Sequence, residues 1–319
     1  MSPAAAAGPR VETVLGPVAA TELGWVLPHE HTAIALWHIP ARWDYWELRR
    51  DEPAIVEELA AFRAAGGGTL VDLTLPGVGR DPRWLARISR ATGLHVVMGA
   101  GWSRGAYYPA EALIDRRTVD SLADEIVRDI EMGVGETGIR AGIIGEIGTD
   151  KPWLSAQEER VHRAAARAAR RTGASISTHA AQSAVGLDQL DVFESEGADL
   201  TRVVIGHSDS NPDPAYHLAI AGRGATVEFD FIGMSFTPLE RFGEDRLVEN
   251  LCSLLAAGHV ERVMLSQDVC HDSQLKRYGG NGYSYLAESF LPRLRSAGVG
   301  DAEIETMTVA NPRRLLTIG

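Results

Sequence analysis

The chain has 319 residues, and its 45% of hydrophobic and 23% of charged residues are an ordinary balance for a globular protein. A formal net charge of −12 argues against a nucleic-acid partner, because binding of that kind needs a basic surface. No run approaches the ~18 consecutive apolar residues of a membrane span, so we expect no membrane partner. Residues 1–10 lack the apolar stretch of a secretory signal, and the chain has only two cysteines, so we expect a cytoplasmic location.

Eight short apolar runs, rich in β-branched residues, follow one another along the chain. They span residues 24–31, 69–75, 94–101, 141–148, 174–180, 202–209, 225–231 and 262–268. Most are continuously apolar, which is typical of parallel strands covered by helices. Residues 1–12 are predicted to be a disordered tail and residues 13–319 a single domain, because no linker or shift in composition interrupts the pattern.

Segments with apolar residues at helical spacing lie between these runs. They span residues 52–65, 118–132, 155–172, 184–196, 213–222, 245–258 and 284–297. In the third of them, Ser155 and Glu158 have the spacing of a capping box, and Gly173 ends the helix. Eight strands alternating with helices favour an α/β fold of the (β/α)8 TIM barrel type over a doubly wound sheet.

The first apolar run ends in the sequence His29-Glu30-His31. Side chains alternate between the two faces of a strand, so His29 and His31 point the same way and Glu30 points the other way. Two imidazoles that converge at the end of a buried strand are an arrangement typical of metal ligands. Later runs end in the further candidate ligands Glu146, His179, His207 and Asp268.

The positions of these candidates support the barrel. All of them lie near the carboxyl ends of predicted strands, and those ends meet on one face of a (β/α)8 barrel. In an open sheet, the first, fourth, fifth, sixth and eighth strands would not bring their side chains to one point. We therefore expect a metal site at that face, although a buried Glu146 paired with an arginine and core histidines at His179 and His207 are the alternative interpretations.

Four histidines and two carboxylates suffice for two divalent ions if one group bridges them. Glu146 is the natural bridge, because each carboxylate oxygen is able to bind a different cation. Asp268 would bind one ion and accept a proton from bound water. Two ions that share a water lower its pKa towards neutrality, so the expected chemistry is hydrolysis by a bridging hydroxide.

Several stretches resemble one known family. They are LPHEH (27–31), RAGIIGEIG (140–148), STHA (177–180), IGHSD (205–209), LSQD (265–268), SQLKRYGGNGYSY (273–285) and ANPRRLL (310–316). From about residue 13 onward, the chain resembles the phosphotriesterase-like family of the amidohydrolase superfamily, and especially the phosphotriesterase homology proteins.

This resemblance implies a role for each ligand. His29, His31 and Asp268 would bind the more buried ion, His179 and His207 would bind the more exposed one, and Glu146 would bridge both. Zinc is the expected metal, and manganese, cobalt or iron would also suit these ligands. A homodimer would follow the habit of the family.

One departure from the family pattern bears on the substrate. The best-known phosphotriesterases use a carboxylated lysine as the bridge, whereas here no lysine precedes Lys151 in this region and Glu146 takes that place. We therefore expect a lactonase or carboxylic ester hydrolase acting on a small lactone, with anionic and phosphorylated lactones among the candidates. The alternatives are a phosphotriesterase, an amide hydrolase, or a non-catalytic barrel that only binds metal.

Four further residues are candidates for substrate binding: Arg241, Lys276, Arg277 and Tyr278. Fixed cations and a phenol suit a phosphate or carboxylate group, although Lys276 and Arg277 also fit a solvated loop. Asp209 and Asp230 are candidate supports behind the ligands, where an acid orients a ligand imidazole. A solvated loop position for Asp209 and a place in the barrel wall for Asp230 are the alternatives.

Overall fold

A parallel barrel forms the centre of the protein in the computed structural model, which describes residues 8–36, 47–234 and 243–318. Its strands, in order around the sheet, are β3 (Trp25–Glu30), β6 (Gly67–Asp72), β7 (His95–Ala100), β8 (Ile143–Gly148), β9 (Ile176–His179), β10 (Val203–Gly206), β11 (Thr226–Phe229) and β12 (Val263–Leu265). The amide of Asp268 donates to the carbonyl of His29 at 3.2 Å, which joins the last strand to the first. The predicted (β/α)8 barrel is therefore confirmed, with all eight predicted runs forming strands.

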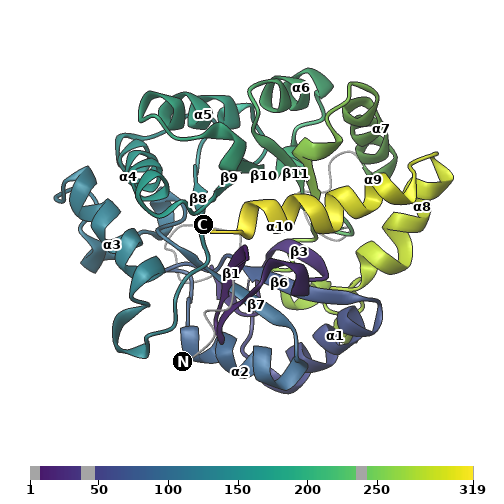
Figure 1. The fold of residues 1–319 in the computed structure, drawn as a ribbon, viewed down its shortest axis with the longest axis horizontal. Helices are drawn as coiled ribbons and strands as arrows, with labels where there is room; N and C mark the ends of the chain where they lie inside the picture. The colour runs from purple at the N-terminus through teal and green to yellow at the C-terminus, as the bar shows by residue number, and fades with distance from the viewer. Residues whose placement is uncertain (1–7, 37–46, 235–242, 319) are drawn as a thin grey trace.

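Helices surround the strands as an outer ring, and the last of them, α10, runs across one end of the barrel (Figure 1). They are α1 (Glu52–Ala64), α2 (Pro82–Thr92), α3 (Val119–Glu131), α4 (Ala156–Thr172), α5 (Val185–Ser195), α6 (Pro214–Gly222), α7 (Gly243–Ala256), α8 (Leu291–Ser296), α9 (Asp301–Glu305) and α10 (Asn311–Leu316). π-helical turns at Leu286–Phe290 and Thr306–Ala310 precede α8 and α10. The capping box of α4 is present, with the amide of Ser155 donating to Glu158 Oε2 at 2.9 Å.

A small hairpin closes the amino-terminal end of the barrel. Strand β1 (Arg10–Thr13) pairs antiparallel with β2 (Gly16–Ala19), so the boundary predicted for the disordered tail is wrong for residues 10–12. Val11 is fully buried in a cluster with the strand residues Val26, Val71 and Val97. An isolated bridge joins Arg10 to Ile318, and β1 and α10 lie across the same end of the barrel (Figure 1). Two short strands, β4 (Ile34–Ala35) and β5 (Glu47–Leu48), form a separate pair.

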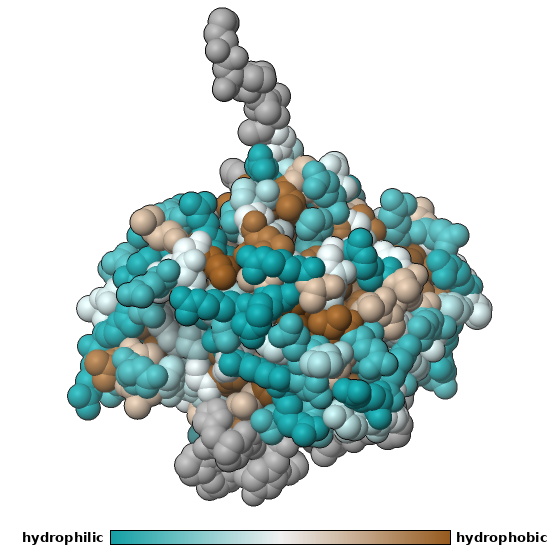
Figure 2. All heavy atoms as spheres, turned by 90° about the horizontal axis from the view of Figure 1, so that it is seen from below, coloured by the Kyte–Doolittle hydropathy of each residue, from teal (hydrophilic) through white to brown (hydrophobic). Residues whose placement is uncertain are grey.

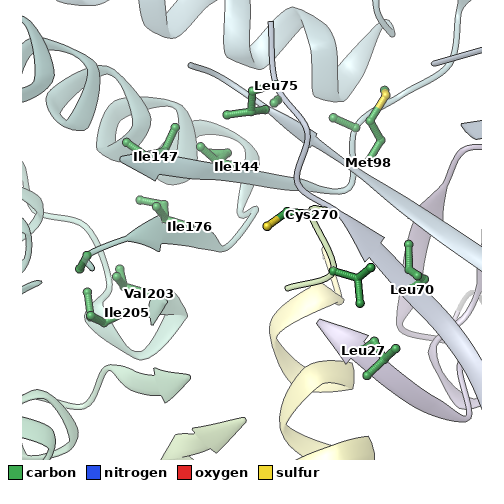
Figure 3. Packing of buried hydrophobic residues seen from close by; sticks show 14 of the residues in the cluster. Leu27, Leu70, Leu75, Met98, Ile144, Ile147, Ile176, Val203, Ile205 and Cys270 are labelled. Carbon is green, nitrogen blue, oxygen red and sulfur yellow. The ribbon is translucent and has the colours of Figure 1, made fainter. Parts of the chain in front are cut away.

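The main core lies between the strands and the outer helices. Strand residues such as Leu27, Leu70 and Ile144 belong to one buried cluster (Figure 3). Helix residues such as Ile55 and Phe62 belong to the same cluster. Burial of these side chains is the main source of stability, at roughly 1.5–3 kcal/mol for each one fully buried. The core therefore holds the strand ends, and with them the candidate ligands, in a fixed frame.

The outer surface is mainly hydrophilic in the view of Figure 2, with apolar residues interspersed among polar ones. Among the described residues, no helix is long and apolar enough to cross a membrane. The candidate ligands lie at or just after the carboxyl ends of the strands, opposite the end that the hairpin closes.

Candidate metal centre

The strand ends bring the candidate ligands together. His29 lies in β3, Glu146 in β8 and His179 at the end of β9, while His31, His207 and Asp268 follow β3, β10 and β12. His207 and Asp268 have positive φ angles of 55° and 46°. Non-glycine residues rarely adopt such angles, and when they do it is often at functional sites. Both angles belong to the turns that immediately follow these strands.

Glu146 lies at the centre of the cluster. Its Oε2 is 2.7 Å from His179 Nδ1, 2.9 Å from His207 Nε2 and 3.4 Å from His29 Nε2. His179 Nδ1 is also 2.7 Å from His207 Nε2. One carboxylate therefore contacts imidazoles from three different strands, which is the position that a bridge between two ions requires.

A second group of ligand atoms lies on the other side of His29. His31 Nε2 is 3.2 Å from Asp268 Oδ1, and the ligand atoms of His29, His31 and Asp268 all lie within 4.8 Å of one another. The ligand atoms of His29, Glu146 and His207 also lie within 4.8 Å of one another. Among the described residues, the buried atoms His29 Nε2 and Asp268 Oδ1 have no hydrogen-bond partner. Buried polar atoms are normally satisfied, so these two atoms fit a site that binds a cation.

Acids on β11 orient two of the imidazoles from behind. Asp230 Oδ1 lies 2.8 Å from His207 Nδ1, and Asp230 Oδ2 lies 3.1 Å from His29 Nδ1. Glu228 Oε2 lies 2.9 Å from the same His29 nitrogen. A partner on Nδ1 leaves Nε2 of each ring for a metal, which is the usual arrangement around metal-binding histidines. Asp230 is among the predicted supports, whereas Glu228 is missed, although strand alternation puts both residues on one face.

The other predicted support, Asp209, acts on backbone instead of on an imidazole. Its Oδ2 accepts a hydrogen bond from the amide of Phe231 at 2.7 Å, and the Phe231 ring stacks on His207 with centroids 4.5 Å apart. Burial, together with the charge of Asp230, raises the pKa of Asp209 well above its usual value. Asp209 therefore fixes the segment following Asp230 through a hydrogen bond to its backbone.

Glu30 points away from the candidate ligands, as alternation predicts, and contacts the turn that carries Asp268. Its Oε1 accepts from the amide of Gln267 and its Oε2 from the amide of Val269, both at 2.8 Å. Burial raises the pKa of Glu30 to about 8 in spite of these hydrogen bonds. Because its two oxygens hold the amides on either side of Asp268, Glu30 fixes the backbone that aims this aspartate into the site.

The electrostatics of the cluster depend on the carboxylates. Burial alone would lower the pKa of His207, but the charge of Asp230 and hydrogen bonds to Asp230 and Glu146 raise it to about 10. Burial lowers the pKa of His179 to about 4, and the charge of His207 acts in the same direction. Burial would raise the pKa of Glu146, yet the adjacent imidazoles hold it well below its usual value. Glu146 therefore carries a negative charge where a cation would bind.

The candidate substrate residues lie in pairs with acids at the surface. Lys276 Nζ is 2.8 Å from Glu288 Oε2, Arg277 NH1 is 3.4 Å from Asp51 Oδ2, and Tyr278 is 47% exposed. Arg241 lies outside the described residues. A clamp formed by these side chains stays a prediction.

Comparison with known proteins identifies the family. The sequence model described as the phosphotriesterase family matches residues 9–316. The chain belongs to the phosphotriesterase family. The phosphotriesterase homology protein of Escherichia coli (strain K12) is 36% identical over 290 residues, which cover 91% of this chain and 96% of that protein. The N-acetyltaurine hydrolase of Dictyostelium discoideum is 35% identical over 274 residues, covering 82% of this chain and 72% of the relative.

A solved structure agrees with the fold. The lactonase Lmo2620 from Listeria monocytogenes has a TM-score of 0.86 at 28% identity, with 97% of this chain and 99% of that chain covered. These relatives are hydrolases, and the clustered ligands suit a metal. The chain is therefore a metal-dependent hydrolase of the phosphotriesterase family.

Proposed function

We propose that the protein is a binuclear hydrolase that attacks the carbonyl carbon of a small lactone or carboxylic ester. The observation that carries the proposal is the position of Glu146, whose Oε2 lies within 3.4 Å of imidazole nitrogens from His29, His179 and His207. A direct glutamate bridge at this point supports two ions without a modified lysine.

His29, His31 and Asp268 would hold one ion, His179 and His207 would hold the other, and Glu146 would contact both. When bound, the ions would supply an acidified water and a Lewis acid for the substrate carbonyl. Zinc suits imidazole and carboxylate ligands in a site of this kind, and manganese, cobalt and iron are the other candidates.

The side chains of the chain itself have three tasks. Asp230 and Glu228 hold His29 and His207 so that each Nε2 faces the centre of the site. Asp268 would use Oδ1, which lies 3.2 Å from His31 Nε2, as a ligand, and Oδ2 would accept the proton of the attacking water. The cluster is almost closed to solvent, since side-chain exposure is 9% for Glu146 and 7% for Asp268, and this strengthens its electrostatic interactions.

A second candidate function is hydrolysis of an N-acyl amide. The relatives named N-acetyltaurine hydrolase favour it, at 35% identity for the protein of Dictyostelium discoideum and 29% for that of Homo sapiens. The same attack on a carbonyl carbon would serve both reactions, with an amine in place of an alcohol as the leaving group.

The test combines metal analysis with a panel of substrates. Purified protein is expected to contain two divalent ions per chain. It should hydrolyse lactones or aryl esters faster than paraoxon-like triesters. N-acyl amino acids and N-acetyltaurine test the amide reaction. A chelator should abolish turnover, and added zinc should restore it. Metal binding without chelator-sensitive turnover of any of these compounds would instead indicate a non-catalytic barrel.

A further inference from the structure

Arg104, in the loop after β7, lies close to the candidate metal centre although it is not among the ligands. Its side chain is only 15% exposed, and it extends past the end of β8 towards His179 at the end of β9. An arginine that is largely buried in a loop on the functional face of a barrel calls for a charged partner.

The residue at position 148 makes this placement possible. A Cβ on Gly148 would lie 2.5 Å from Arg104 Cγ and 3.1 Å from His179 Cβ. Any side chain at this position would therefore collide with the arginine. The glycine leaves room for the stem of Arg104 to pass directly beside a candidate ligand.

The contacts of Arg104 within the described part of the chain leave its guanidinium hydrogen-bonding capacity unused. The nearest carboxylate, that of Asp150, forms an ion pair with Arg104, but its Oδ1 is 3.7 Å from NH1, which is too far for a hydrogen bond. The guanidinium carbon also lies 4.6 Å from the centroid of the Tyr107 ring, a cation–π contact. The guanidinium is thus held in one place with donors available for an anion.

The charge of Arg104 influences groups at the carboxyl ends of more than one strand. After burial and the charge of His207, it is among the influences that lower the pKa of His179. It also opposes burial at Cys270, whose thiol pKa burial raises well above its usual value. Because Cys270 follows β12 and His179 ends β9, the charge of Arg104 acts on two strand ends that are not adjacent in the barrel.

We propose that Arg104 binds a carboxylate or sulfonate group of the substrate and so restricts the enzyme to small anionic lactones, esters or N-acyl compounds. A fixed cation beside a metal-binding imidazole opposes the charge of the metal, and a substrate anion between them relieves that repulsion. The planar guanidinium matches the oxygens of both anions. This inference rests on the proposed function, because the bound anion must place a carbonyl group at the metal centre.

The experiment compares Arg104→Met and Arg104→Lys with the wild type, all loaded with zinc. Each anionic substrate is paired with a neutral one of similar shape: N-acetyltaurine and N-acetyl-β-alanine against N-propylacetamide, and a carboxylated γ-butyrolactone against γ-butyrolactone. In Arg104→Met, kcat/KM should fall about 10- to 150-fold for the anionic compounds, the range of a charge-assisted hydrogen bond. It should change less than about threefold for the neutral compounds, and Arg104→Lys should recover part of the loss.

Binding gives a readout that does not depend on turnover. Calorimetric titration of the zinc-loaded protein with taurine and with β-alanine should show Kd rising by a similar factor in Arg104→Met, and the two titrations separate sulfonate from carboxylate recognition. Arg116→Met is the matched control, because the Arg116 side chain is 75% exposed and its nearest acid is Asp115 at 3.7 Å. This control should leave both kcat/KM and Kd unchanged.

Equal losses of kcat/KM for neutral and anionic compounds in Arg104→Met would overturn the inference and indicate a purely structural arginine. Unchanged kinetics and binding in this variant would also overturn it. These results differ from failure of the proposed function. If taurine or β-alanine binding depends on Arg104 while no compound is turned over in a chelator-sensitive manner, the anion site stands and the hydrolase function does not.

Discussion

His207 and His179 are neighbours with opposite electrostatic character. Their ring centroids are 4.3 Å apart, yet the pKa is about 10 for His207 and about 4 for His179. Burial lowers both values, but the charge of Asp230 and hydrogen bonds to Asp230 and Glu146 outweigh it at His207. His179 has His207 and Arg104 as positive neighbours, and only Glu146 acts in the other direction.

This contrast separates the imidazoles of the site. His29 and His207 have buried negative charge behind them, which Asp230 and Glu228 supply from the end of β11. His179 has a cation nearby instead. We therefore expect the ion that His29, His31 and Asp268 would hold to be bound more tightly, and the ion that His179 and His207 would hold to depend more on the substrate anion.

The largest effect should come from Asp268→Asn, which removes an anionic ligand from the ion that His29 and His31 would also hold. Turnover should fall by about 10²- to 10⁴-fold, the usual contribution of a positioned proton acceptor. At least one ion should remain bound, because Glu146, His179 and His207 are unchanged. The measurements are kcat on the best substrate of the panel and elemental analysis of the purified variant. Turnover close to that of the wild type would remove Asp268 from its assigned role.

A smaller effect, on metal affinity, should distinguish the role of Asp230 from that of Asp209. In Asp230→Asn, metal affinity should fall about 10- to 100-fold, as is usual when the acid behind a metal-binding histidine is lost. In Asp209→Asn, the affinity should change little, because Asp209 contacts a backbone amide instead of an imidazole, and the oxygen of an asparagine side chain can still accept from the Phe231 amide. Competition with a chelator measures both affinities, and thermal unfolding checks that each variant is folded. Similar losses of metal affinity in the two variants would show that contact with an imidazole does not distinguish Asp230 from Asp209.

The smallest effect is the pH dependence of metal uptake by the metal-free protein. His207 has a pKa of about 10 and keeps its proton at neutral pH, so a metal must displace that proton. Affinity should therefore rise between pH 6 and 9, by about tenfold per pH unit for each proton released. His179, with a pKa of about 4, is already neutral in this range and adds no dependence. Metal titrations at several pH values measure the slope, and a flat profile would contradict the charged state of His207.

The fold could be predicted from the sequence because the barrel strands are continuous apolar runs, whereas other elements have weaker patterns. The hairpin of β1 and β2 is too short to give a clear period. Helix α2 is missed although Asp81 caps it and Pro82 begins it, because the same stretch also reads as a loop between two strands. Helices α9 and α10 were also not predicted.

Prediction of the site was limited in a similar way. The structure brings together the six candidate ligands, since strand ends in a barrel converge whatever the loops do; their role as ligands stays a prediction. Glu228 lies two residues before Asp230, and alternation along β11 was a sufficient signal for it. Arg104 gave no such signal, because its position depends on loop conformation and on the space beside Gly148.

The bridge between Arg10 and Ile318 puts the first and last strand residues of the described chain side by side, on the barrel end remote from the ligands. An affinity tag or a solid support attached next to Arg10 or Ile318 would therefore lie away from the candidate metal centre. The same proximity would let a short peptide join Arg10 to Ile318, so that the chain could be reopened elsewhere as a circular permutant.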